Sequence, residues 1–292
     1  MIILARGKCG LTRCITHYLT AMAAADLLVV FSNAATGIIF NAVYSRMPHT
    51  VVCTLQNVMA FASFDCSVWL TVAFTFDRFV AICYQKFKIK YCTVRTARIA
   101  IGTVYALSLL RNIPYYFAFE SYELYVPIGC VEKLEYHYLP GWLAFSWLHN
   151  ILTPLLPFFV ILLLNILTVR SILVASRARR KLRAHVSGER KVDPEMESRM
   201  KSIVLLFCVS GSFILLWLTE VTVFIHSHVA NIHAYPNWAH PMFMAFSAGD
   251  MLKILSSCTN TFIYILTQSK IREELRNAIK YPFTKLLGVA TQ

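Results

Sequence analysis

The sequence predicts an all-α membrane protein, a polytopic bundle of six apolar helices followed by a short amphipathic helix at the membrane surface. Three observations predict this fold class. The composition is 57% hydrophobic and only 15% charged, with a mean hydropathy of +0.57, whereas soluble domains average about 25% charged residues. Several stretches are long enough to cross a bilayer. The basic residues alternate between the connecting loops.

The predicted spans are continuous apolar stretches of about 20 residues or more, the length that crosses the hydrocarbon core of a bilayer. They cover residues 18–40, 53–82, 99–119, 142–169, 203–225 and 242–266. We expect two parts, a transmembrane part over residues 1–268 and a cytoplasmic tail over residues 269–292. The tail begins with Ile271, Leu275 and Ile279 at helical spacing between basic residues, which predicts an amphipathic helix along the membrane interface.

The loops differ in charge, and this difference predicts the orientation. Lys and Arg gather before the first span, between the second and third, between the fourth and fifth, and after the sixth. The intervening loops carry only Arg46 and Lys133. Because basic loops stay in the cytoplasm, both ends of this sequence are predicted to be cytoplasmic. The net charge of +13 therefore belongs to separate loops and not to one nucleic-acid-binding face.

Two cysteines lie on the side that this orientation makes extracellular. Cys53 begins the second span, and Cys130 lies in the acidic loop after the third span. Disulfides persist in oxidising compartments, so a bridge is plausible where both cysteines face that side. The expected disulfide is Cys53–Cys130.

The other end of the second span carries an acid–arginine pair. Arg78 lies 25 residues after Cys53, which is about 37 Å along a helix at about 1.5 Å per residue. Asp77 can hold Arg78 in a charge-assisted hydrogen bond, and breaking this hold would free the guanidinium for a docking partner. A plain salt bridge at the membrane boundary is the alternative interpretation.

These features resemble the rhodopsin-like G-protein-coupled receptors in their order and spacing. The resemblance rests on Ala23-Ala24-Ala25-Asp26-Leu27-Leu28, Asp77-Arg78-Phe79-Val80-Ala81-Ile82-Cys83, Asn112-Ile113-Pro114-Tyr115-Tyr116 and Asn260-Thr261-Phe262-Ile263-Tyr264. Within the family, these stretches are most similar to a small group of orphan receptors that respond to aromatic amino acids. The six predicted spans would be six of the seven family helices, with the first helix apparently missing and only its tail at residues 2–5.

The resemblance implies that the cytoplasmic end couples to a heterotrimeric G protein. Arg78 would be the coupling switch, and Asp77 would be the partner that keeps it in the closed state. Asn165 and Tyr264 would be partners that swing inward when the switch opens.

The resemblance also implies a rotamer switch below the ligand, formed by Phe213 and Trp217. Two prolines that are usual in the family are replaced here by Thr219 and Thr261. Because proline removes a backbone hydrogen bond and kinks a helix, both hinges are expected to be stiffer than in the family.

A carboxylate in the middle of the first span is a candidate ion site. An isolated charge there costs about 2.5–3.5 kcal/mol on insertion scales, so Asp26 should face polar groups or an ion. The resemblance implies that Ser67, Ser256 and Asn260 surround it and that the cluster encloses a sodium ion. A structural Asp26 that is protonated or hydrogen-bonded is the alternative.

Ionisable and aromatic residues in the outer half of the spans are candidate ligand contacts. Asp250 and Lys253 are three residues apart and either satisfy each other or divide across a zwitterionic ligand. In the second case its carboxylate would bind Lys253 or Arg111, and its ammonium would bind Asp250 or Glu220. The full set of candidates is Ala60, Phe61, Phe64, Arg111, Glu220, Phe224, Asp250 and Lys253.

The ligand of the aromatic-amino-acid group is not carried over to this chain. The acid of that group's pocket and the arginine after its tryptophan switch fall at Ala60 and Glu220 here. Neither residue type is retained.

These observations predict a plasma-membrane receptor, and not an enzyme, that passes an extracellular small-molecule or peptide signal to a heterotrimeric G protein. Two other classes stay open. The missing helix and the replaced prolines favour a receptor-like fragment or scaffold that does not signal. A transporter or channel is disfavoured because the sequence has no internal repeat. Beyond a sodium ion at Asp26, no cofactor, metal or nucleic acid is expected.

Overall fold

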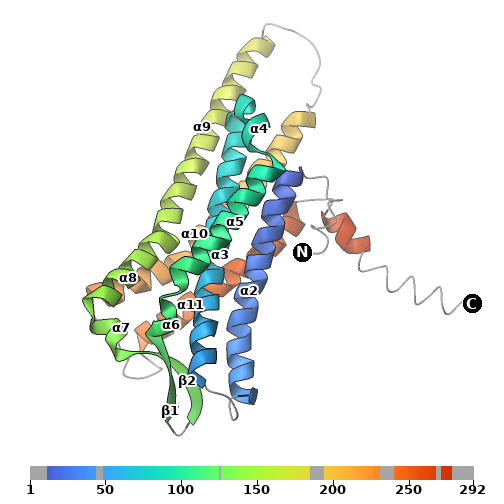
Figure 1. Ribbon diagram of the computed structural model, residues 1–292. Coiled ribbons are helices and arrows are strands. Elements are labelled where there is room, and N and C mark those ends of the chain that lie inside the picture. The colour runs from blue at the N-terminus through green and yellow to red at the C-terminus, as the bar shows by residue number, and fades with distance from the viewer. Residues whose placement is uncertain are drawn as a thin grey trace, which may run out of the picture.

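The computed structural model describes residues 12–43, 49–124, 126–184, 194–230, 240–267 and 271–277. Long helices run side by side along one axis (Figure 1). They are α2 (Arg13–Val43), α3 (His49–Cys83), α5 (Val94–Asn112), α9 (Leu156–Ala184), α10 (Pro194–Val229) and α11 (Pro241–Thr267). The predicted fold class, an all-α membrane helix bundle, is confirmed.

Four helical segments among the described residues are long and apolar enough to cross a membrane. They are Arg13–Asn33, Val51–Cys83, Pro140–Ala175 and Ile203–Val229, and they overlap the first, second, fourth and fifth predicted spans. The third and sixth predicted spans overlap α5 and α11, which have 19 and 27 residues. The boundary between a transmembrane part and a tail at residue 268 stays a prediction.

Two of the predicted spans are broken at prolines. In the third, α5 ends at Asn112 and the short α6 (Tyr115–Ala118) follows, because Pro114 has no N–H to donate to the preceding turn. In the fourth, α8 (Pro140–Asn150) and the π-helical turn η1 (Ile151–Leu155) precede α9.

The break in the fourth span lies at Thr153, which has φ −149° and ψ 101°. Pro154 disfavours helical geometry at the residue before it. Pro157, three residues later, lies inside the regular helix α9.

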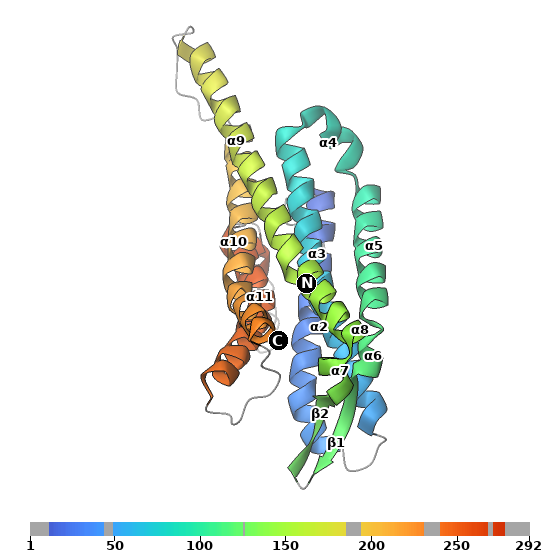
Figure 2. The ribbon, with the colours of Figure 1, turned by 90° about the vertical axis from the view of Figure 1, so that its left-hand side faces the viewer.

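A β-hairpin follows α6, where the sequence predicted only an acidic loop. Strands β1 (Phe119–Leu124) and β2 (Val126–Glu132) are antiparallel, with Ser121 opposite Cys130. The aromatic and β-branched residues of this segment suit a strand. The hairpin and α7 (Leu134–Tyr138) cover one end of the bundle, and α4 (Gln85–Tyr91) lies at the other (Figures 1 and 2). We call these the hairpin end and the α4 end.

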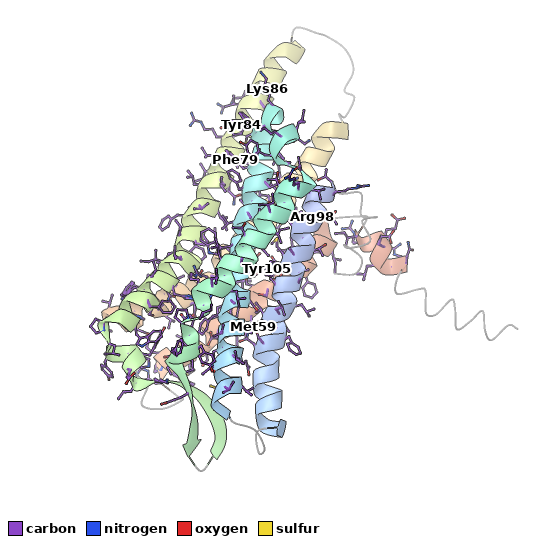
Figure 3. All side chains as sticks on the ribbon, in the orientation of Figure 1. Met59, Phe79, Tyr84, Lys86, Arg98 and Tyr105 are labelled. Carbon is purple, nitrogen blue, oxygen red and sulfur yellow. The ribbon has the colours of Figure 1, made fainter. Side chains whose placement is uncertain are left out.

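Helix α3 lies inside the bundle and connects the two ends. Leu70 and Phe74 are fully buried and pack with Leu19 and Met22 of α2. Figure 3 shows Met59 toward the hairpin end, while Phe79, Tyr84 and Lys86 lie toward the α4 end. Cys53 and Arg78, on either side of this stretch, are therefore at opposite ends of α3, as the sequence predicts.

The beginning of the predicted amphipathic tail is helical over residues 271–277. Ile271 is buried in the cluster that α2 and α3 form. Nη1 of Arg272 donates a hydrogen bond to the carbonyl oxygen of Ile265 at 3.1 Å. These contacts fasten the segment to the α2–α3 cluster and to the end of α11. The rest of the predicted helix lies outside the described residues.

Candidate functional site

The predicted switch pair is buried and closed. Nε of Arg78 donates to Oδ2 of Asp77 at 3.1 Å, and Nη2 of Arg78 binds the same oxygen. Only 7% of either side chain is exposed. The guanidinium also lies 5.9 Å from the centre of the Phe74 ring, a distance at which a ring face attracts a cation.

Two cysteines that the sequence analysis did not select hold Asp77 in place. The Cys14 thiol, on α2, donates to Oδ1 of Asp77 at 3.3 Å. The Cys92 thiol, between α4 and α5, donates to the Asp77 carbonyl oxygen at 3.6 Å. Burial raises the pKa of Cys92 to about 11, so this thiol stays protonated and keeps its hydrogen to donate. The carboxylate and the main chain of Asp77 are therefore held by residues of α2, of α3 and of the segment between α4 and α5.

The other two predicted switch residues are Asn165 and Tyr264. Asn165 is buried on α9 and lines an apolar groove between α9 and α10. Its Oδ1 has no hydrogen-bond partner in the described part of the chain. The Tyr264 side chain lies outside the described side chains. The role of Asn165 and Tyr264 as inward-swinging partners stays a prediction.

Both carboxylate oxygens of Asp26, in the first predicted span, accept hydrogen bonds. The Ser67 hydroxyl donates to Oδ1 of Asp26 at 2.6 Å, and Nδ2 of Asn260 donates to Oδ2 at 3.0 Å. These bonds join α2, α3 and α11 in the middle of the bundle. Ser256 is buried nearby on α11, and the neighbouring Ser257, which was not predicted, also interacts with this carboxylate.

The predicted rotamer pair is in contact. The ring centres of Phe213 and Trp217 lie 5.6 Å apart, and Trp217 meets Phe64 of α3 edge-to-face at 5.9 Å. Trp217 is buried and lines the cavity described next. The ring thus lines the cavity and contacts the helix that carries Arg78.

A cavity of about 560 Å³ opens between α3, α8, α10, α11 and the hairpin. This volume is within the range of about 300–1,000 Å³ that small-molecule pockets occupy. The predicted ligand contacts that line it are Phe61, Phe64, Glu220, Phe224, Asp250 and Lys253. Ala60 and Arg111 are not among its described lining residues.

Three charged side chains form one group on the α10–α11 wall of this cavity. Nζ of Lys253 lies 2.6 Å from Oδ1 of Asp250 and 3.2 Å from Oε1 of Glu220. The pairing of Asp250 with Lys253 that the sequence allowed is therefore present, with Glu220 as a third member. Oε2 of Glu220 is buried and has no hydrogen-bond partner among the described residues.

Arg111 is engaged elsewhere, in a buried network behind the cavity wall. It forms an ion pair with Asp65, whose side chain is fully buried. The Thr153 hydroxyl donates to Oδ1 of Asp65 at 2.7 Å, and Nδ2 of Asn112 donates to Oδ2 at 2.5 Å. The break before Pro154 makes this possible, because it brings the Thr153 hydroxyl against α3.

Two rings that were not among the predicted ligand contacts also line the cavity. Tyr115 stacks on Phe61 with ring centres 4.0 Å apart, and His149 lies 5.7 Å from the same ring. Nδ1 of His149 is buried without a hydrogen-bond partner in the described part. Tyr115 belongs to one of the stretches that carry the family resemblance, but nothing in the sequence alone directs His149 toward the cavity.

The rim of the cavity holds a titratable pair on the hairpin and α7. Nε2 of His137 lies 3.2 Å from Oε2 of Glu132. The hydrogen bond to Glu132 raises the pKa of His137 above its ordinary value, and partial burial opposes this only in part. The pair is therefore held together by charge at mildly acidic pH.

Cys53 is disulfide-bonded. Its sulfur lies 3.7 Å from the Glu120 carbonyl oxygen on β1, and the residue after Glu120 pairs across the hairpin with Cys130. The Cys130 side chain lies outside the described side chains. The pairing of Cys53 with Cys130 therefore stays a prediction, and the backbone of the hairpin favours it.

Comparison with known proteins identifies relatives of this chain. The model of the seven-transmembrane receptors of the rhodopsin family matches residues 1–264. Probable G-protein coupled receptor 142 of Mus musculus is 27% identical over 266 residues, which are 90% of this chain and 65% of that protein. G-protein coupled estrogen receptor 1 of Mus musculus and of Rattus norvegicus are each 24% identical over 272 residues, 89% of this chain and 64% of those proteins. The chain thus spans just under two thirds of the length of these relatives.

Proposed function

Because the chain belongs to the rhodopsin family of seven-transmembrane receptors, we propose that it passes an extracellular small-molecule or peptide signal to a heterotrimeric G protein at the plasma membrane. The family consists of receptors and not of enzymes, and the chain is a multi-pass membrane protein. In the proposed orientation the hairpin end is extracellular, and the α4 end and both ends of this chain are cytoplasmic.

One observation carries the proposal: α3 lines a cavity near one end and holds a closed acid–arginine pair near the other. Phe64 lines the cavity and contacts Trp217 of α10. Arg78 lies further along the same helix, held by Asp77. A ligand in the cavity therefore touches the two helices whose separation would expose Arg78.

The proposed mechanism is a shift between two states of the bundle. A ligand that binds more tightly when the α4 end of α10 has moved away from α3 favours that open state. To change the ratio of open to closed receptors from 1:99 to 99:1, the ligand must prefer the open state by about 5.5 kcal/mol. In the open state, Arg78 leaves Asp77 and offers its guanidinium to backbone carbonyl groups of a docking helix. Asn165 and Tyr264 are its proposed partners.

The Asp26 cluster is a candidate site for a sodium ion in this mechanism. Hard cations prefer oxygen ligands, and the Asp26 carboxylate and Ser67 hydroxyl fit that preference, with Ser256 and Asn260 on the adjacent α11. A sodium ion would supply positive charge to a buried carboxylate. Thermal unfolding in sodium chloride against choline chloride at equal ionic strength tests this. We expect a sodium-dependent rise in the midpoint that Asp26→Ala abolishes, and equal midpoints in the two salts would contradict the assignment.

The receptor proposal is tested by nucleotide exchange on G proteins. The full chain is placed in lipid nanodiscs, and exchange is measured on a panel of heterotrimers with wild type, Asp77→Asn and Arg78→Ala. We expect Asp77→Asn to accelerate exchange on at least one heterotrimer without added ligand, since Arg78 is no longer held by a charge. Arg78→Ala should give no more exchange than empty nanodiscs.

The matched control is Arg98→Ala, which removes an exposed arginine at the same end of the bundle and should behave as wild type. If Asp77→Asn equals empty nanodiscs on every heterotrimer, the chain does not couple and the scaffold alternative is favoured. Solute flux through liposomes containing the chain would favour the transporter alternative.

A further inference from the structure

The cavity is acidic, and this bears on its ligand. The carboxylates of Glu132, Glu220 and Asp250 line it, whereas Lys253 is its one lysine or arginine among the described residues. Glu132 is engaged by His137 at the rim. The remaining three groups carry two negative charges and one positive charge when ionised. Because charges act more strongly where water is excluded, this group favours a cation over an anion.

Lys253 is not available to a carboxylate of a ligand. Its Nζ already contacts both Asp250 and Glu220, and only 13% of its side chain is exposed. Nζ also lies 5.1 Å from the centre of the Phe64 ring. An anionic group would have to replace one of these contacts while lying beside a second carboxylate, which repels it.

The two carboxylates, in contrast, keep capacity to accept hydrogen bonds. The Asp250 side chain is 40% exposed and lines the cavity, and Oε2 of Glu220 has no hydrogen-bond partner among the described residues. A carboxylate offers about four acceptor positions, of which Lys253 takes one on each. An ammonium group placed at Asp250 would form a charge-assisted hydrogen bond and bring the charge of the group to zero.

Arg111, the other cation that could have bound a ligand carboxylate, is held behind the wall. It pairs with Asp65, and its Nη2 donates to the Thr153 hydroxyl at 2.6 Å. Asp65 is fully buried, so drawing Arg111 into the cavity would leave a buried carboxylate unpaired, which is strongly unfavourable. The division of a zwitterion between Arg111 and Glu220 is therefore disfavoured.

Aromatic rings form much of the remaining wall, including those of Phe61, Phe64, Trp217 and Phe224. Ring faces attract cations and supply apolar contact area. We infer that the cavity takes a monocationic amine with an aromatic or apolar body, its ammonium group on Asp250 and Glu220, in preference to a zwitterion or a carboxylate. This inference rests on the proposed receptor function, because it names the ligand class of the same cavity.

The test uses four small probes of one shape and different charge. The full chain in nanodiscs is melted with phenethylamine, 2-phenylethanol, L-phenylalanine or 3-phenylpropanoate, each up to about 10 mM, which is ten times a Kd of about 1 mM. We expect phenethylamine to raise the melting midpoint most, because a ligand that binds only the folded state stabilises it. No stabilisation by phenethylamine, or an equal or larger effect of either carboxylate-bearing probe, would overturn the inference.

Two variants test the named carboxylates. Asp250→Asn should weaken phenethylamine binding at least about tenfold, as for the loss of about 1.4 kcal/mol, and Glu220→Gln should weaken it also while leaving the Asp250–Lys253 pair in place. Glu135→Gln removes an exposed carboxylate of α7 outside the cavity and should bind as wild type. Undiminished binding by both cavity variants overturns the inference. No G protein is present, so a failure of coupling cannot produce these results.

Discussion

Gly249 on α11 lies directly against Glu220 on α10. A Cβ atom added at Gly249 would fall 2.9 Å from Oε2 of Glu220 and 3.3 Å from its Cα. Small residues let two helices approach closely in a membrane, and here the approach lies at the charged group of the cavity. Glycine at this position therefore sets how closely α10 and α11 pack beside the proposed ligand site.

This contact predicts that Gly249→Ala displaces the Glu220 carboxylate or separates α10 from α11. The backbone atoms of Glu220 leave little room to adjust, so the melting midpoint in nanodiscs should fall, with a loss of about 1–3 kcal/mol as for other overpacked sites. Gly211→Ala is the matched control, because a Cβ there meets nothing within 4 Å and alanine is the better helix former. Equal midpoints for the two variants would contradict the close approach.

A second prediction concerns the buried network of Asp65. Asp65→Ala leaves the partly buried Arg111 without its carboxylate, and removing one partner of a buried pair costs about 3–5 kcal/mol. Nε of Arg111 already lacks an acceptor in the described part, so the loss of Asp65 leaves still more of the guanidinium without a partner. The free energy of unfolding in detergent should fall by that amount, whereas Glu135→Ala, at an exposed carboxylate, should leave it unchanged.

The double variant Asp65→Leu with Arg111→Met separates charge pairing from packing. Replacing both partners by apolar residues removes the unpaired charge, so the double variant should be more stable than Asp65→Ala alone. The loss of stability in the double variant is compared with the sum of the losses in Asp65→Leu and Arg111→Met alone. If the two are equal, the charges are not coupled and the pair contributes through packing only.

Local patterns in the sequence predicted the features that depend on neighbours along one helix. Apolar length and loop charge predicted the spans, because both follow from the bilayer as solvent. The contact of Phe213 with Trp217 and that of Asp250 with Lys253 follow from residues three or four apart on one helix face. The opposite placement of Cys53 and Arg78 follows from helical rise alone.

Contacts between distant segments could not be predicted in the same way. The Cys14–Asp77 bond joins residues 63 apart in the chain, and the Asp65–Thr153 bond joins residues 88 apart. Such pairs depend on how helices rotate and pack, which spacing does not encode. The hairpin was missed for a related reason, since its strands were interpreted as an acidic loop from their charge rather than from their β-branched and aromatic residues.

The disulfide of Cys53 gives a third prediction. Cys53→Ser should lower the free energy of unfolding by about 2–4 kcal/mol, because a crosslink that closes a long loop restricts the unfolded chain. Cys208→Ser, at an exposed free cysteine, should have little effect. Peptide mapping of the unreduced wild type should find Cys53 joined to Cys130, and a link to any other cysteine would show that the predicted pairing is wrong.

The His137–Glu132 pair gives the last prediction, a dependence of stability on pH. Glu132 raises the pKa of His137 in the folded chain above its ordinary value, so folding favours the protonated ring. The stabilisation is therefore complete below the ordinary histidine pKa of about 6.5 and is lost as the pH rises through the higher pKa of the folded state. Both side chains are partly exposed, so the contribution should be about 0.2–1 kcal/mol.

This contribution is measured from the melting midpoints of wild type and His137→Gln. The pH is varied from 5.5 to 8.5, within about two units of the ordinary histidine pKa. Wild type should be the more stable at the acidic end, and the difference should shrink toward the alkaline end. His226→Gln, at an exposed histidine of α10, corrects for general effects of pH. A difference that is constant or grows with pH would show that the His137–Glu132 pair does not carry it, since only the protonated ring attracts Glu132.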